Sequence, residues 1–442
     1  MILIREDFLH YLWRFKYFAI NKLQTTSNEP IHIINVGEHN FNSGPDFFSA
    51  KIKIADQLWA GNVEIHVKSS DWYLHHHEQD SNYDNVILHV VWVDDIGVYD
   101  KNNRLIPTLE LNTYVSQGIL DQYSLLFSKK MKWINCENLI TTIDNFTVDN
   151  WLEVLYFERL EEKTNLINTF LESSSNDWEA VLFKLLVKNF GLKINGDAFL
   201  NLADSIDFKV LRKEQFKLIN IEAIFFGQAG FLQEKKEDPY YQKLQIEYRY
   251  LQKKYHLEPV FNGQFQFFRL RPNNFPTIRI AQLAYLYFSH HNLFSKILEI
   301  NTKDSFYKLF RIKTSSFWEQ HYGFASKSVS RPKKLSKSFI DLIIINTVIP
   351  IKFMYFKHMG HFKEELILNL IKQIAPENNS ILKKFESLFD KRSILPGDTY
   401  FKLSIDNALD SQALLQLKNA YCNYQLCLKC SIGNSLIQGD KL

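Results

Sequence analysis

The fold is decided by residues 44–68, GPDFFSAKIKIADQLWAGNVEIHVK. Residues 55–57 (Ala-Asp-Gln) have the composition of a turn between two strand-forming runs. At the end of the second run, apolar and polar residues alternate strictly as Val63, Glu64, Ile65, His66, Val67 and Lys68. Because successive side chains of a strand point to opposite faces, this alternation predicts a β-hairpin. Its second strand would present a carboxylate, an imidazole and an ammonium in a row.

Asp46 begins the first strand of this hairpin, so two carboxylates, those of Asp46 and Glu64, would come from neighbouring strands. Such a pair suits Mg²⁺ or Mn²⁺, because both cations prefer carboxylate oxygen. A cation held there would polarise a phosphodiester and activate water, while His66 or Lys68 orients or deprotonates the nucleophile. We therefore predict metal-dependent phosphodiester hydrolysis, with Asp46, Glu64, His66 and Lys68 as the catalytic residues.

The flanking sequence predicts the rest of a small α/β core. The expected elements are, in order, an amphipathic helix at 5–23, a strand at 31–36, the two hairpin strands, a short helix at 72–78, a strand at 86–93 and a terminal hairpin at 96–115. The run VILHVVWV at 86–93 is continuously apolar and has the length of a buried central strand.

This order of elements resembles the core of the PD-(D/E)xK nuclease superfamily. Pro45-Asp46 stands where that family has its PD, and Glu64 stands where it has its (D/E). The resemblance covers residues 1 to about 115. It implies a restriction-endonuclease-like mixed sheet with Asp46 and Glu64 as ligands of a divalent ion, and it makes Glu38 an additional acid.

The chain departs from this resemblance at the third motif position, where His66 replaces the family's lysine and Lys68 follows one same-face step later. The alternative function is therefore a non-catalytic nucleic-acid-binding or assembly protein that keeps the nuclease fold. The longer stretch from Asn42 to Trp72 also resembles an uncharacterised bacterial domain-of-unknown-function family. That likeness extends to the C-terminus and implies no assigned activity.

The motif residues also have a simpler interpretation. Asp46 could cap a turn after Gly-Pro, and the polar residues of the second strand could be the solvated face of an antiparallel hairpin. Against this interpretation, Trp59, Trp72, Tyr73 and Trp92 crowd the region together with several histidines. A plainly solvated face does not have this composition.

The histidines of this region are His66, His75, His76, His77 and His89. A set of histidines with Glu64 could bind Zn²⁺ in place of a harder cation. Adjacent side chains at the end of a helix diverge, so at most one or two of His75, His76 and His77 can join Glu64 and His66. His89 lies inside an apolar run and is expected to be a core histidine bonded to a neighbour.

Length and composition predict a soluble protein of two or three domains. We expect the fold class α+β, with an α/β core at 1–140, a helical domain at 141–300 and a helical C-terminal domain at 301–442. Hydrophobic residues make up 46% and charged residues 23%, as in soluble globular proteins. The net charge of +3 is nearly balanced, so a nucleic-acid surface would be a local patch. We find no signal pattern and no apolar segment of membrane-spanning length, since 339–350 is short and interrupted, and we expect a cytoplasmic protein.

Two basic segments in the helical part are candidates for contacts with DNA or RNA. The first, at 265–279, combines arginines with aromatic residues, which suit phosphate and base stacking respectively. The second, at 326–337, is polar and basic. The expected contacts are Arg269, Arg271, Arg279, Lys333 and Lys334. The alternatives are a structural loop whose arginines pair with acids elsewhere and an ordinary solvated loop.

The four cysteines are Cys136, Cys422, Cys427 and Cys430, the last three in C-x4-C-x2-C spacing. This spacing with one further cysteine suits an iron–sulfur cluster, and four thiolates equally suit structural Zn²⁺. In a reducing compartment such a set indicates metal binding rather than disulfides. Some nucleases of the superfamily that the chain resembles carry an iron–sulfur cluster on one distant cysteine and three clustered ones, but here Cys136 follows the nuclease motifs. The alternative is four reduced cysteines in a helical core.

Overall fold

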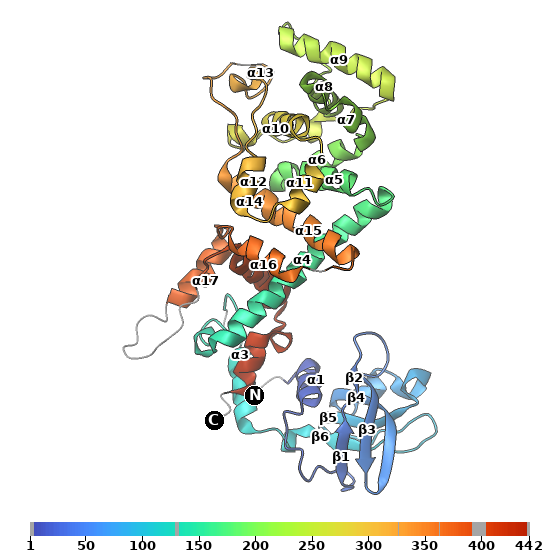
Figure 1. The fold of residues 1–442 in the computed structure, drawn as a ribbon. Coiled ribbons are helices and arrows are strands. Elements are labelled where there is room, and N and C mark those ends of the chain that lie inside the picture. The colour runs from blue at the N-terminus through green and yellow to red at the C-terminus, as the bar shows by residue number, and fades with distance from the viewer. Residues whose placement is uncertain (1–3, 129–131, 326, 362, 391–403, 440–442) are drawn as a thin grey trace. The chain divides into compact units, whose positions relative to one another are not determined.

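The computed structural model describes residues 4–128, 132–325, 327–361, 363–390 and 404–439 (Figure 1). A mixed β-sheet near the N-terminus precedes a mainly helical remainder, which confirms the predicted α+β class. The described residues form two compact units. The first comprises those up to Trp151 and those from Leu417 onward, and the second comprises Leu152–Asp390 and 404–416. This division differs from the expected boundaries after residues 140 and 300, because the end of the chain groups with the N-terminal unit.

The sheet of the first unit has the strand order β1-β3-β4-β5-β6, and β2 pairs with the start of β3. The strands are β1 (Ile31–Asn35), β2 (Glu38–His39), β3 (Phe47–Ile54), β4 (Gln57–Lys68), β5 (Val86–Val93) and β6 (Thr108–Glu110). β3 and β4 form the predicted antiparallel hairpin, and β5 lies parallel to β4. The predicted apolar strand is β5, which is buried from Ile87 to Val91 between two neighbours. β4 also lies in the interior of the sheet, because it pairs with β3 on one side and with β5 on the other.

The terminal hairpin predicted at 96–115 is wrong in its second half. Tyr99 and Leu105 form only an isolated antiparallel bridge around a turn whose amides donate to Asp100. The chain then returns to the sheet, where β6 pairs in parallel with β5. The local turn chemistry was correctly recognised, but the pairing of the following strand depends on the sheet edge that is available.

α1 (Glu6–Phe15) lies against β4 and buries Phe8, Leu9, Leu12 and Trp13. We predicted a helix to residue 23, but it ends at Phe15. Lys16 takes the left-handed conformation (φ 54°), and the amide of Tyr17 donates to the carbonyl of Leu12. This pattern ends a helix by giving its last carbonyls hydrogen-bond donors, and the spacing of the apolar residues does not predict where it occurs.

The first unit also contains a small helical part. Its elements are α2 (Asp71–Leu74), the 3₁₀ turns η1 (His77–Gln79), η2 (Ser81–Tyr83) and η3 (Leu111–Thr113), α3 (Gln117–Leu126), η4 (Ile140–Thr142), the π-helical turn η8 (Leu417–Tyr421), the 3₁₀ turns η9 (Cys422–Tyr424) and η10 (Cys427–Lys429), and α19 (Ser431–Gln438). α19 packs against both α3 and η10. The last helix of the chain is thereby joined to residues more than three hundred positions earlier.

The second unit is helical throughout its described residues. After α4 (Asn145–Ser173), which begins in the first unit, its helices are α5 (Trp178–Phe190), α6 (Leu192–Asp204), α7 (Phe208–Glu214), α8 (Leu218–Gln228), α9 (Pro239–Tyr255), α10 (Pro276–Ser289), α11 (Leu293–Glu299), α12 (Lys303–Leu309), α13 (Ser316–Glu319), α14 (Lys337–Ile343), α15 (Ile349–His358), α16 (Glu364–Lys372), α17 (Ser380–Asp390) and α18 (Ala408–Gln416). Asp177 caps α5 by accepting hydrogen bonds from the amides of Glu179 and Ala180.

One continuous helix corrects our statement about apolar segments. Lys337–His358 is long and apolar enough to span a membrane by length and composition, and 72% of it is buried inside the fold. We judged residues 339–350 to be too short and interrupted by polar residues, whereas the helix extends beyond this stretch at both ends. A π-helical turn at Ile344–Val348 connects α14 to α15, so Pro350 falls in the first turn of α15, where its missing amide costs little. Its burial is that of a helix in the core of the fold.

Candidate metal and catalytic site

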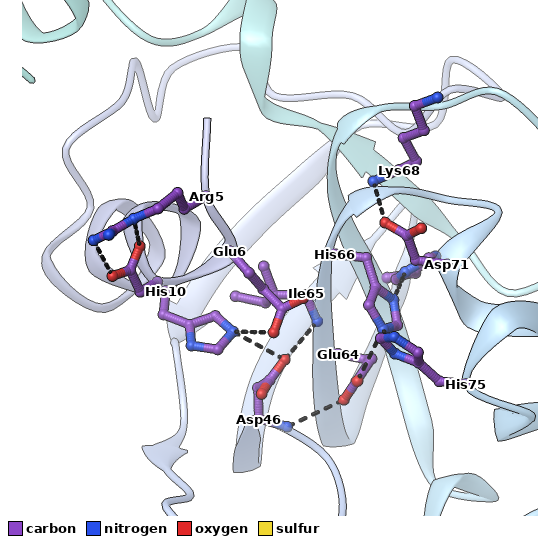
Figure 2. A network of polar contacts seen from close by, with 12 residues as sticks. Arg5, Glu6, His10, Asp46, Glu64, Ile65, His66, Lys68, Asp71 and His75 are labelled. Atoms are coloured by element: carbon purple, nitrogen blue, oxygen red, sulfur yellow. Dashed lines mark hydrogen bonds and ion pairs between the residues drawn. The ribbon is translucent and has the colours of Figure 1, made fainter. Parts of the chain in front are cut away.

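Asp46 and Glu64 meet at the point where β3 begins beside β4. The Asp46 amide donates a hydrogen bond to Glu64 Oε2 at 3.2 Å, and Asp46 Oδ2 accepts one from the amide of Ile65 at 2.9 Å (Figure 2). Each carboxylate is therefore held by the backbone of the other strand. The two acids that the hairpin predicted do come together.

α1 adds two groups to this pair that the sequence analysis did not identify. His10 Nε2 lies 3.2 Å from Asp46 Oδ2 and 3.9 Å from Glu6 Oε1 (Figure 2). Burial opposes the charged form of His10, but the hydrogen bond and charge of Asp46 outweigh it and raise the pKa of the imidazole. Burial, with a contribution from Asp46, raises the pKa of Glu6. The available signal was the i,i+4 spacing of Glu6 and His10 on the predicted helix.

Burial excludes the solvated-face interpretation of β4. Glu64 is 4% exposed and His66 is 1% exposed, so both faces of the strand are covered at this point. Burial and the nearby charge of Asp46 raise the pKa of Glu64 to about 9. In the absence of a cation, Glu64 is thus protonated at neutral pH, and a bound cation would take the place of that proton.

Three imidazoles lie on the other side of Glu64. Glu64 Oε1 is 3.2 Å from His77 Nε2 and 3.5 Å from His66 Nε2, and His66 Nε2 is 3.2 Å from His75 Nδ1. Ligand atoms of His66, His75 and His77 all lie within 4.8 Å of one another. The sequence allowed one or two of the three consecutive histidines to join Glu64 and His66, and the structure brings in His75 and His77.

A core histidine supports this group. His89 on β5 is fully buried, and its Nε2 lies 2.8 Å from His66 Nδ1, as expected for a core histidine bonded to a neighbour. Burial lowers the pKa of His66 to about 2, of His89 to about 3 and of His77 to about 4. These imidazoles are neutral at physiological pH, which is the form that binds a metal.

Two predicted site residues are not brought to the carboxylates. The side chain of Lys68 is exposed and points away from Asp46 and Glu64 (Figure 2), and only its backbone amide is engaged, with Asp71. Glu38 is exposed on β2, whose next residue, His39, stacks on Phe47. Since neighbouring residues of a strand face opposite ways, the Glu38 carboxylate points away from the side on which His39 packs.

The four cysteines line one cavity in the first unit, together with Asn135 and Gly433. Burial raises the pKa of the thiols of Cys422 and Cys430, to about 12 and about 11, with further contributions from neighbouring thiols. The pKa of the Cys136 thiol is also raised, mainly by burial and then by the three neighbouring thiols. Asn135 Nδ2 donates to Cys427 Sγ at 3.4 Å. Cys136 is therefore next to the C-terminal trio, as the shared metal set requires.

The basic residues of the second unit divide into exposed and internal ones. Arg269, Arg271 and Lys334 are exposed, and the last two line one cavity with Arg279. Arg279 is only 5% exposed: its guanidinium donates to Asn274 and Gln282, lies 3.4 Å from the centre of the Phe339 ring, and has its pKa lowered to about 9 by burial. Lys333 is 3% exposed and donates to the carbonyl of Glu319.

A groove in the first unit borders His10 and was not anticipated from the sequence. His10, which touches Asp46, is part of its lining. Its lining also includes two exposed cations, Arg14 and Lys429, two exposed aromatic rings, Phe15 and Phe41, and one acid, Asp7. Lys429 Nζ lies 5.4 Å from the centre of the Phe41 ring. The residues 39–42 and 426–429 that face each other here are too far apart in sequence for any local pattern to pair them.

A family model described as a protein of unknown function (DUF2851) matches residues 6–380. The match covers more than half of the 442 residues, so the chain belongs to this family. The resemblance to a domain-of-unknown-function family is thus confirmed, although the match ends at residue 380 and not at the C-terminus, where we expected it to end. No similar curated protein and no similar solved structure was found.

Proposed function

We propose that this member of the DUF2851 family is a metal-dependent nuclease-like hydrolase of the PD-(D/E)xK type, acting on nucleic-acid phosphodiester bonds. The observation that carries the proposal is the pair of hydrogen bonds by which Asp46 and the buried Glu64 are held to each other's strand, with Glu6 beside them. Asp46 contributes to the raised pKa of both Glu6 and Glu64, and Glu6 contributes to that of Glu64, so the group as a whole favours a cation. Oxygen donors of this kind suit Mg²⁺ or Mn²⁺.

A divalent cation bound there would supply Lewis acidity and a bound water of lowered pKa. Asp46 and Glu64 would hold it, and their reciprocal backbone hydrogen bonds fix the two carboxylates relative to each other. His10 would accept a proton during the reaction, because its Nε2 lies beside Asp46 and its ring also lines the groove. In this proposal His10, and not Lys68, takes the place of the family's basic residue.

The groove supports nucleic acid as the substrate class. Cationic side chains that follow a phosphate backbone and aromatic rings on which bases stack are the two components of single-strand binding surfaces. Arg14 and Lys429 supply the first, and Phe15 and Phe41 supply the second. We place this reaction in the cytoplasm, because no disulfide joins the four cysteines in the described residues, as in proteins of a reducing compartment.

The test is cleavage of a panel of labelled single- and double-stranded DNA and RNA with Mg²⁺ or Mn²⁺. Asp46→Ala and Glu64→Ala should each abolish cleavage, while Glu38→Ala, which removes an exposed acid of the same sheet, should retain it. Cleavage that survives in both site variants would exclude this site. A wild type that binds the same strands but cleaves none of them would favour the non-catalytic binding function, for which the distance of Lys68 from the carboxylates is the supporting observation.

We also propose that Cys136, Cys422, Cys427 and Cys430 bind a metal centre that stabilises the C-terminal segment of the first unit. A single tetrahedral Zn²⁺ holds its sulfur ligands ~3.8 Å apart, given Zn–S bonds of about 2.3 Å. All four cysteines line one cavity, which brings their thiols together for such an ion. An iron–sulfur cluster is the other centre that four thiolates suit, since its irons bind the thiolates at separate corners.

The cysteine proposal is tested on anaerobically purified protein by iron, sulfide and zinc analysis. Cys136→Ser should lower the metal content and the melting temperature together, because binding of the metal is coupled to folding of this region. Stoichiometric zinc without sulfide would exclude the cluster. A Cys136→Ser protein with unchanged metal content would reduce the set to the C-terminal trio.

A further inference from the structure

A second group of donors lies on the histidine side of Glu64, and the hydrolytic proposal does not use it. His66, His75 and His77 point their ring nitrogens at one region, and Glu64 Oε1 borders it. His66 Nε2 lies 3.2 Å from His75 Nδ1 and 3.5 Å from Glu64 Oε1, and Glu64 Oε1 lies 3.2 Å from His77 Nε2. A tetrahedral ion with metal–nitrogen bonds of about 2.0–2.1 Å holds its ligands ~3.3 Å apart. These three separations are close to that spacing, and the ligand atoms of the three histidines all lie within 4.8 Å of one another.

The local chain conformation creates this arrangement. His76 takes the left-handed conformation (φ 60°) between α2 and η1. The reversal at His76 lets His75 and His77 approach the same point, while the side chain of His76 stays 74% exposed. Three consecutive histidines on a regular helix would have diverged.

The surroundings hold two of the rings in place. His89 Nε2 lies 2.8 Å from His66 Nδ1, so His66 can donate from Nδ1 and direct the lone pair of Nε2 toward the other donors. The ring of Tyr83 stacks on His77 with centres 3.7 Å apart. Metal-bound histidines characteristically have a hydrogen-bond partner on the second ring nitrogen, as His66 has in His89, because that partner fixes the tautomer and the ring orientation.

We propose that His66, His75 and His77, with Glu64 as the fourth donor, bind a late first-row divalent cation of the Zn²⁺ type. Imidazole nitrogens select Zn²⁺, Ni²⁺ or Cu²⁺ over Mg²⁺, which prefers oxygen. The site shares Glu64 with the hydrolytic site, since Oε1 faces the histidines and Oε2 faces the Asp46 amide. It does not require the protein to hydrolyse phosphodiesters.

The experiment measures bound zinc in metal-stripped protein after it is reloaded with Zn²⁺ and desalted. His75→Ala and His77→Ala should each contain about one equivalent less zinc than wild type, whereas His76→Ala, the matched control, should not differ. Asp46→Ala should also retain this zinc. Zinc held by cysteines contributes equally to all four variants and cancels in the difference. Co²⁺ loading gives a second readout, because a four-coordinate Co²⁺ site absorbs visible light and this absorption should be lost with His75 or His77.

The outcomes separate this proposal from the nuclease proposal. Equal zinc in wild type, His75→Ala and His77→Ala would overturn the histidine site, whatever the cleavage assays show. His75 is exposed, so its replacement should leave the fold intact, and circular dichroism of the stripped proteins checks this for both variants. If His77→Ala unfolds because its ring packs on Tyr83, His75→Ala alone still decides. Loss of cleavage in Asp46→Ala with zinc retained would support both proposals independently.

Discussion

The amide of Asp46 donates to Glu64 Oε2 at 3.2 Å, so the first residue of the motif positions the second through the backbone and not through its own carboxylate. The Asp46 side chain is instead held by the next amide along β4, that of Ile65. Neither carboxylate is neutralised by a lysine or arginine in the contacts of the described residues, and His10 is the basic group beside Asp46. An acidic pair that is positioned but not neutralised is suited to a cation.

Glu64→Gln should stabilise the protein in the absence of metal. Because burial raises the folded-state pKa of Glu64 to about 9, the folded protein holds a proton that the unfolded chain loses above its ordinary pKa of 4.5. Stability from this group is therefore greatest below about pH 4.5 and falls as pH rises toward 9. Glutamine does not titrate, so at pH 8 in a chelating buffer the variant should be more stable by on the order of 2 kcal/mol or more.

Chemical denaturation of wild type and Glu64→Gln at pH 5 and pH 8 checks this prediction. The difference should be small at pH 5 and large at pH 8. Addition of Mn²⁺ should stabilise wild type and have little effect on the variant, because this cation prefers the carboxylate oxygen that glutamine lacks. A difference between the two proteins that is the same at both pH values would mean that Glu64 is not protonated in the folded state.

Lys68→Ala should leave any metal binding and cleavage unchanged. Lys68 is four residues beyond Glu64, about 13 Å along a strand at ~3.3 Å per residue, and its side chain is exposed. His10→Ala should instead lower the rate, by about 10²-fold or more if it transfers a proton. Parallel cleavage assays of the two variants compare the candidates directly. A loss of activity in Lys68→Ala with normal activity in His10→Ala would restore the lysine of the family pattern to the mechanism.

Local patterns predicted the part of the site that lies on adjacent strands. The alternation in β4, the apolar run of β5 and the short connection between β3 and β4 placed Asp46 and Glu64 together. The same alternation predicted that Lys68 lies on the same face of the strand as Glu64. It carried no information about the direction of the Lys68 side chain at the end of β4. Glu6 and His10 were missed because the face of α1 that meets the carboxylates depends on tertiary packing. The left-handed residues Lys16 and His76 are equally silent in the sequence, since neither is glycine.

Arg279→Ala should destabilise the second unit, whereas Arg271→Ala should not. Removal of the Arg279 guanidinium leaves the half-buried Asn274 and the buried Gln282 acceptors without this donor and removes the ring contact with Phe339. The expected cost is about 2–4 kcal/mol. Arg271 is exposed, and its replacement should change stability by less than about 0.5 kcal/mol. Urea denaturation compares the variants, and equal stability would mean that the Arg279 guanidinium is not needed for packing.

The groove prediction concerns binding of single strands. Arg14→Ala and Lys429→Ala should each weaken binding of a single-stranded oligonucleotide and reduce the slope of log Kd against log salt by about 0.7. Phe41 is 68% exposed, and Phe41→Ala should cost about 1–3 kcal/mol of binding with an unchanged slope, because stacking releases no counterions. Lys53→Ala, which removes an exposed lysine of β3 that pairs with Asp56, is the matched control. Fluorescence anisotropy across a salt series measures both quantities. If Arg14→Ala, Lys429→Ala and Lys53→Ala all bind with the same slope as wild type, the groove does not carry the phosphate backbone.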